Sequence, residues 1–73
     1  MSNSVHKTKI KTLGLRGFYV YEIYLITAGM DVWYEAVPKT PDCVTRTANT
    51  EQELKAILAN DVEQVIKFQQ KVR

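Results

Sequence analysis

A chain of 73 residues with 45% hydrophobic and 25% charged side chains forms one small domain, and it is too apolar for a disordered chain. The net charge of +2 is too small to indicate a class of partner by itself, and the longest apolar run is far shorter than the roughly 20 residues that cross a membrane. Because a domain of this size buries only about 60% of its unfolded surface, we expect a protein partner or a second copy to add stability.

The charges are unevenly distributed along the chain. Residues 1–17 have a net charge of +4 and no acidic residue, whereas the rest of the chain has a net charge of −2. The four cations of the first segment are Lys7, Lys9, Lys11 and Arg16. This pattern predicts a basic N-terminal arm before a mildly acidic body. Within residues 5–15 the lysines alternate with other residues, so the segment is alternatively an edge strand whose lysines discourage pairing with another sheet.

Three further strands are expected. Residues 18–26, FYVYEIYLI, are dense in the aromatic and β-branched side chains that fit a pleated surface. Residues 27–31 supply the Gly and Asp of a five-residue hairpin loop, and residues 32–37 return as its second arm. The following PKTP breaks the ladder, because proline has no N–H to donate. Residues 43–48 are then expected to form a short strand at an edge.

A helix is predicted from about residue 50 to 71. Thr50 and Glu53 have the spacing of a capping box, in which each side chain bonds the other residue's backbone N–H. The apolar residues at helical spacing are Leu54, Ile57, Leu58, Val62, Val65, Ile66 and Val72. They form one buried stripe. Asn60 and Asp61 compete for backbone hydrogen bonds, which leaves a kink or a break into two helices open.

The predicted fold is therefore one α+β domain, residues 1–73, in β-β-β-β-α order. Residues 1–17 form the basic arm or edge strand, and residues 18–48 form an antiparallel sheet of three to four strands. One C-terminal amphipathic helix, residues 50–71, covers one face of that sheet.

Residues 34–66 resemble the core of HicB-type antitoxins, in which a hairpin strand leads into a VP-x-x-P-G-C-x-T turn, a short strand and a T-x-E-E-A helix start. The matching residues are Val37, Pro38, Pro41, Cys43, Thr45, Thr50, Glu53 and the helix stripe. The chain departs from the pattern at Asp42, where the family has glycine, in the ANT before the helix, and in showing no DNA-binding tail. The resemblance implies an RNase-H-like or dsRBD-like partial fold that blocks a toxin ribonuclease by binding it.

The sequence shows no catalytic motif. His6 is the sole histidine and is interpreted as a solvated side chain in a mobile N-terminal region, and Cys43 as a free buried thiol. Glu22 and Glu35 could divide acid and base roles if the hairpin register brings them together, but such residues more often mark the wetter face of a sheet. No glycine-rich phosphate loop is present. We therefore expect no enzymatic activity, no metal and no cofactor.

The two faces of the sheet are expected to differ. On residues 18–26 the apolar or amphipathic positions are Tyr19, Tyr21, Ile23 and Leu25. This set is predicted to lie under the helix. The opposite face would expose Phe18, Tyr24 and Trp33 beside the two glutamates, and such a concentration of aromatic side chains is typical of a contact surface. The alternative is that a second copy or the N-terminal arm covers it.

Two functions of different class fit these observations. The first is a protein-binding inhibitor, antitoxin-like or of phage or mobile-element type, that occludes a partner protein. Its predicted partner-binding residues are Phe18, Tyr24, Trp33 and Glu35. The second is a nucleic-acid-binding domain whose sheet aromatics stack on bases. Its phosphate contacts, which are rim contacts in the first interpretation, are Lys7, Lys9, Lys11 and Arg16. The glutamates on the aromatic face repel phosphates, so the first interpretation is favoured. The single cysteine and the absence of a signal segment predict a cytoplasmic protein, and the short apolar runs predict no membrane association. The small core and the aromatic face predict a possible homodimer.

Overall fold

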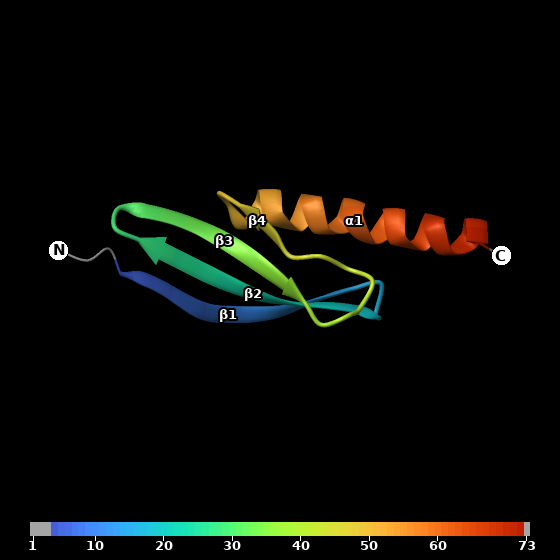
Figure 1. The fold of residues 1–73 in the computed structure, drawn as a ribbon, viewed down its shortest axis with the longest axis horizontal. Helices are drawn as coiled ribbons and strands as arrows, with labels where there is room; N and C mark the ends of the chain where they lie inside the picture. The colour runs from blue at the N-terminus through green and yellow to red at the C-terminus, as the bar shows by residue number, and fades with distance from the viewer. Residues whose placement is uncertain (1–3, 73) are drawn as a thin grey trace.

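The computed structural model describes residues 4–72 and confirms the α+β fold: a four-stranded antiparallel sheet followed by one C-terminal helix (Figure 1). The elements in chain order are β1 (Val5–Leu15), β2 (Tyr19–Ala28), β3 (Asp31–Pro38), β4 (Arg46–Ala48) and α1 (Glu51–Val72). The strands lie in the order β1-β2-β3-β4, so β1 and β4 form the two edges. The segment expected as an arm or an edge strand is a strand, and His6 lies within it, opposite Thr27, rather than in a mobile region.

The hairpin between β1 and β2 closes through three residues, 16–18, and the hairpin between β2 and β3 closes through two, 29–30. Arg16 and Gly17 begin the first turn with φ angles of 56° and 69°, and Phe18 N donates a hydrogen bond to Leu15 O at 3.2 Å. Two positive φ angles are those of a type I′ turn, whose twist matches that of the flanking strands. Gly29, with φ 62°, begins the second turn. The prediction of a five-residue loop is wrong, because the ladder between β2 and β3 continues to the pair Ala28 and Asp31. Only Gly29 and Met30 lie between the two strands.

A bulge divides β1 into two parts. The register with β2 shifts between Lys9 and Lys11, so that Lys9 lies opposite Tyr24 and Lys11 opposite Ile23. Since neighbouring residues of a strand point to opposite faces, the shift places Lys9 on one face of the sheet and Lys11 on the other. The alternation of lysines in the sequence therefore does not put all of them on one side.

The hydrophobic core lies between the sheet and α1. Tyr19, Tyr21 and Ile23 of β2 are buried against Leu58 of the helix. The other buried members of this core are Ala36, Leu54 and Val62. The predicted face for β2 is thus confirmed at its first three odd positions. Leu25, the fourth, is only half-buried.

The helix begins where the capping residues predict. Thr50 Oγ1 accepts a hydrogen bond from Glu53 N at 3.1 Å, and the helix then continues without a break through Asn60 and Asp61. Asp61 does not compete for the backbone because its carboxylate binds Arg46.

The helix is displaced relative to the sheet along the long axis of the molecule, which measures 55 × 19 × 16 Å. In Figure 1, α1 starts above the middle of the sheet, and its C-terminal turns extend past the turn between β1 and β2. The last turns of the helix therefore have no strand beneath them, and the hairpin between β2 and β3 has no helix above it.

Candidate functional site

The structure separates the three aromatic residues that the sequence groups on one surface. Tyr24 and Trp33 share the face opposite the helix, which we call the open face, and both are half-buried. Trp33 lies beside Ile26, which is buried on that same face. Phe18 lies in the turn before β2, with 67% of its surface exposed and its ring edge-on to that of Tyr19 at 5.2 Å. Phe18 therefore does not form a single patch with the other two.

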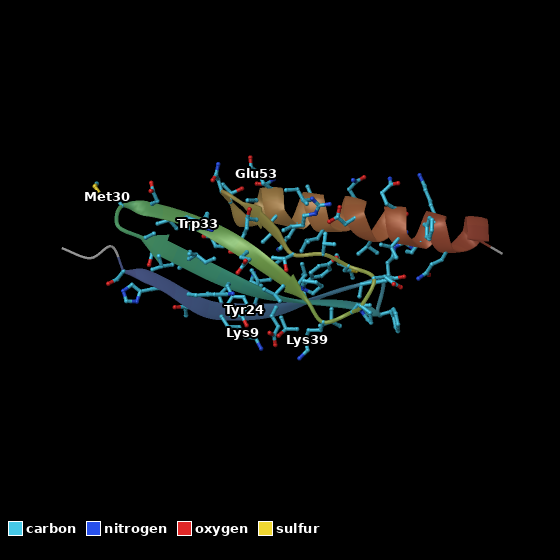
Figure 2. All side chains as sticks on the ribbon, viewed as in Figure 1. Lys9, Tyr24, Met30, Trp33, Lys39 and Glu53 are labelled. Carbon is cyan, nitrogen blue, oxygen red and sulfur yellow. The ribbon has the colours of Figure 1, made fainter. Side chains whose placement is uncertain are left out.

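Glu22 is the centre of a charged cluster on the open face. Its carboxylate binds Lys9 Nζ at 3.2 Å and Lys39 Nζ at 3.5 Å, and it accepts a hydrogen bond from the hydroxyl of Tyr24 at 3.0 Å. Figure 2 labels these three partners on the side of the sheet away from α1. These donors, Lys9 first, hold the pKa of Glu22 below its usual range. A carboxyl group with a lowered pKa stays ionised at neutral pH, which does not suit a general acid.

Lys7 lies over the ring of Tyr24 on the open face. Its ammonium lies 2.9 Å from Glu35 Oε1 and 4.7 Å from the centre of the Tyr24 ring. Glu35 lies opposite Tyr24 in the register and is therefore diagonal to Glu22. Glu35 binds Lys7, and Glu22 binds Lys9 and Lys39, so the two carboxylates that could have divided acid and base roles are held in separate ion pairs instead.

The other two cations of the N-terminal segment bind the helix. Lys11 Nζ lies 2.6 Å from Glu51 Oε2, and Arg16 pairs with Glu63. Together with Lys7 and Lys9, each of the four lysine and arginine side chains of residues 1–17 contacts an acid of the body. The segment expected as a basic arm or an edge strand is therefore an edge strand whose cations are paired with acids.

A groove lies between the edge strand β4 and the flank of α1. It consists of two adjoining hollows of about 590 Å³ and about 640 Å³ that share Thr47, Ala56 and Ile57. The other lining residues are Trp33, Ala48, Asn49 and Glu53 in the first hollow and Thr45, Arg46, Asn60 and Asp61 in the second. The helical members recur at every third or fourth position, so they form one stripe along the helix. We call this feature the β4–α1 groove.

The β4–α1 groove has an open strand edge for one wall. β4 pairs with β3 through three residues on one side and is a sheet edge on the other. Arg46, the one cation of β4, donates two hydrogen bonds to Asp61, of 2.6 Å and 3.2 Å. The carboxylate of Asp61 raises the pKa of the Arg46 guanidinium. The small side chains of Ala48 and Ala56 leave room between strand and helix. Such a groove has the shape and the backbone groups to take an extended chain.

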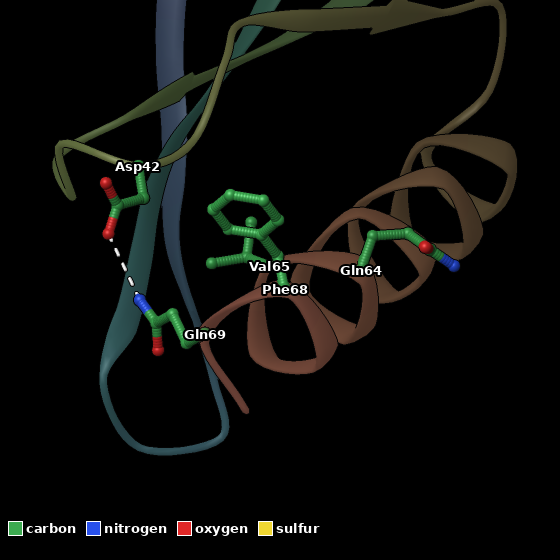
Figure 3. Close-up of a pocket in the computed structure, with 5 residues that line it drawn as sticks. All are labelled: Asp42, Gln64, Val65, Phe68 and Gln69. Atoms are coloured by element: carbon green, nitrogen blue, oxygen red, sulfur yellow. Dashed lines mark hydrogen bonds between the residues drawn. The ribbon is translucent and has the colours of Figure 1, made fainter. Parts of the chain in front are cut away.

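A second apolar hollow lies on the last turns of α1, which have no strand beneath them. It measures about 540 Å³ and is lined by Asp42, Gln64, Val65, Phe68 and Gln69 (Figure 3). Gln69 Nε2 donates a hydrogen bond to Asp42 Oδ2 at 3.2 Å, which ties the helix to the loop before β4. We call these five residues the distal shelf. The sequence prediction omitted Phe68, although it continues the spacing of the buried stripe.

The remaining chemistry-bearing groups do not form a reactive site. The hydroxyl of Tyr21 is buried with no hydrogen-bond partner among the described residues, and burial, followed by the neighbouring thiol of Cys43, raises its pKa. Cys43 is half-buried against the core rather than fully buried. Within residues 4–72 no three His, Cys, Asp or Glu side chains lie close enough together to hold a metal ion.

Comparison with known proteins gives no match: no family model fits the chain, and neither the curated proteins nor the solved structures contain a significant similarity. The resemblance to HicB-type antitoxins therefore stays a prediction. In the part of the chain that the structure describes, no helix combines the length and the apolar character that crossing a membrane requires.

Proposed function

We propose that this protein is a non-enzymatic protein-binding domain that takes an extended segment of its partner into the β4–α1 groove. The observation that carries the proposal is the open edge of β4 beside a groove walled by the helix. An extended segment that lies against this edge gains main-chain hydrogen bonds, and its alternate side chains enter the hollows.

Trp33 provides the anchor in this proposal. It lies on the open face, one residue past the last pair between β3 and β4, and there it borders the first hollow of the groove. Trp33 is half-buried, so a large rigid side chain is already held in place before binding. Aromatic side chains held in this way dominate the energy of many interfaces, because they bury a large area and lose few rotamers. Of the predicted partner-binding residues, Trp33 is the one that lines this groove.

The charge arrangement supports a protein partner over a nucleic acid. Phosphate contacts require cations that are free to replace counterions. The four cations of residues 1–17 are instead paired with glutamates, and phosphate contacts would compete with these pairs. The action proposed for the protein is inhibition by occlusion, as in an antitoxin-like or mobile-element inhibitor.

Selection from a library of displayed random peptides tests this proposal and does not require the partner to be identified first. The selected peptide is titrated into ¹⁵N-labelled protein, and we expect the amide signals of residues 46–48 and the indole signal of Trp33 to shift. Signals that shift only on β1, or a library that yields no binder, would contradict the proposal.

Electrophoretic mobility shift with RNA and DNA at low and high salt tests the alternative. We expect no complex at low salt. Binding that weakens steeply as salt rises would favour the nucleic-acid function instead.

A further inference from the structure

The distal shelf is an apolar surface in an unusual position. Phe68 follows Leu54 by fourteen residues, which is about 3.9 helical turns, so both side chains project from nearly the same side of α1. That side is buried against the sheet at Leu54 and Leu58, whereas Phe68 has 67% of its surface exposed. The stripe that forms the core thus continues past the sheet.

The polar groups of the shelf indicate what can cover it. Gln64 and Gln69 carry amides, which both donate and accept hydrogen bonds, so each is complementary to its own copy. The one carboxylate, that of Asp42, already accepts a hydrogen bond from Gln69. Within the five shelf residues, two copies can therefore meet without bringing unpartnered like charges together. A surface that is apolar at its centre and self-complementary at its rim suits a two-fold contact, which is the commonest form of self-association.

We propose that the distal shelf is a homodimer interface at which a second copy of this chain packs helix to helix. Phe68 and Val65 of each copy lie at the centre, and the glutamine amides bond across the two-fold axis. A domain this small buries a limited share of its surface, so covering the exposed stripe adds to its stability. The shelf shares no residue with the β4–α1 groove, and a dimer formed here leaves that groove open.

Sedimentation equilibrium of the full chain tests the interface. We expect the wild-type protein to dimerise, and Phe68→Glu to raise the dimer dissociation constant at least about 30-fold, as the loss of a buried aromatic anchor does. Met30→Glu is the matched control, because Met30 is fully exposed at the turn between β2 and β3 and lies outside the shelf. Unchanged circular dichroism of Phe68→Glu would show that the fold is retained.

Disulfide trapping tests the geometry of the contact. In a Cys43→Ser background, Gln64→Cys is expected to form an intermolecular disulfide on mild oxidation, and Lys55→Cys, on an exposed part of the same helix, is not. A wild-type chain that stays monomeric at concentrations on the order of 100 μM, where even weak contacts form, would overturn the proposal. So would a dimer that survives Phe68→Glu, because its interface would then lie elsewhere.

Discussion

The two edges of the sheet differ in length, in charge and in what lies beside them. β1 presents eleven residues along one edge, with three lysines and a bulge in the middle. β4 presents three residues, with no lysine, no proline and one cation bound by Asp61. Lysines and bulges are devices that keep exposed edges from pairing with other chains, and so is a very short edge strand. The longer edge is therefore protected by charge and a bulge, whereas only its shortness limits pairing at the other edge.

This difference assigns separate roles to the two sides of the molecule. The lysines of β1 protect the edge and also bind acids on both faces of the sheet, so the strand is held to the body by charge as well as by its ladder. β4 is held by three residue pairs, by the ion pair to Asp61 and by the helix that begins three residues later. A partner that adds a strand meets less resistance at β4.

The largest expected effect is the loss of peptide binding when Trp33, the proposed anchor of the β4–α1 groove, is removed. We expect Trp33→Ala to weaken binding of a library-selected peptide by about 2 kcal/mol or more, because a held aromatic anchor is lost. Folding should lose less, since Trp33 lies on the face opposite the core. Isothermal titration and urea denaturation measure the two effects. If the variant unfolds while binding per folded molecule stays intact, the groove is not the binding site.

Adding a lysine to β4, like those of β1, tests directly whether the two edges differ in their resistance to a partner strand. Thr47→Lys places a lysine on the open edge, and we expect it to weaken peptide binding by on the order of tenfold, the equivalent of about one hydrogen bond. Thr12→Lys is the matched control, since Thr12 is an exposed threonine on the edge that is already protected. Equal losses in the two variants would mean that added charge, rather than its position, opposes binding.

The helix cap that follows β4 is expected to have a smaller effect, on stability. Thr50→Ala should lower the free energy of unfolding by about 1 kcal/mol, because Glu53 N loses the hydroxyl that accepts its hydrogen bond. Thr8→Ala in β1 serves as the control, since Thr8 is exposed and no such cap depends on it. A urea midpoint that does not move in Thr50→Ala would show that this hydrogen bond does not hold the helix start.

Local signals in the sequence were sufficient for most of the fold. Period-two alternation, the capping pair and the helical stripe depend on neighbours within a few residues, and the strands, the helix start and the buried face of β2 follow from them. The length of the second hairpin loop did not follow, because a glycine with positive φ closes it in two residues. Chain composition alone does not distinguish that turn from a longer loop.

The candidate site was less predictable because it depends on contacts between distant residues. Trp33 was identified as an anchor, but the groove beside it requires α1 to lie next to β4, which no local pattern specifies. The ion pairs of the basic segment were not predicted for the same reason, since Lys11 and Arg16 meet Glu51 and Glu63 only after the helix packs on the sheet. The spacing of Phe68 would have assigned it to the helix stripe, but its exposure depends on the displacement between helix and sheet, which no local pattern specifies.

The smallest expected effect is the pH dependence that the ion pairs of β1 give to stability. Hydrogen bonds from Lys9 and Lys11 lower the pKa of Glu22 and of Glu51 below the ordinary value of about 4.5. A carboxyl group with a lowered pKa in the folded state contributes stability that is fully present above its unfolded pKa and is lost as pH falls through the folded pKa. The urea midpoint should therefore be steady near neutral pH and fall once the pH drops below about 4.5.

At alkaline pH, stability is lost as the pH rises rather than as it falls. The pKa of Lys7 is raised by Glu35, so its contribution is complete below the ordinary lysine value of about 10.5 and is lost as pH rises through the folded value. Glu22→Gln should remove part of the decrease in the urea midpoint at acidic pH, because Gln cannot titrate. The decrease in the urea midpoint at alkaline pH should not change, because Lys7 keeps Glu35 as its partner. Salt near 1 M should reduce both decreases, since these exposed pairs are screened. If the acidic decrease in Glu22→Gln equals that of the wild type, the Lys9 and Lys39 contacts do not stabilise the protected edge.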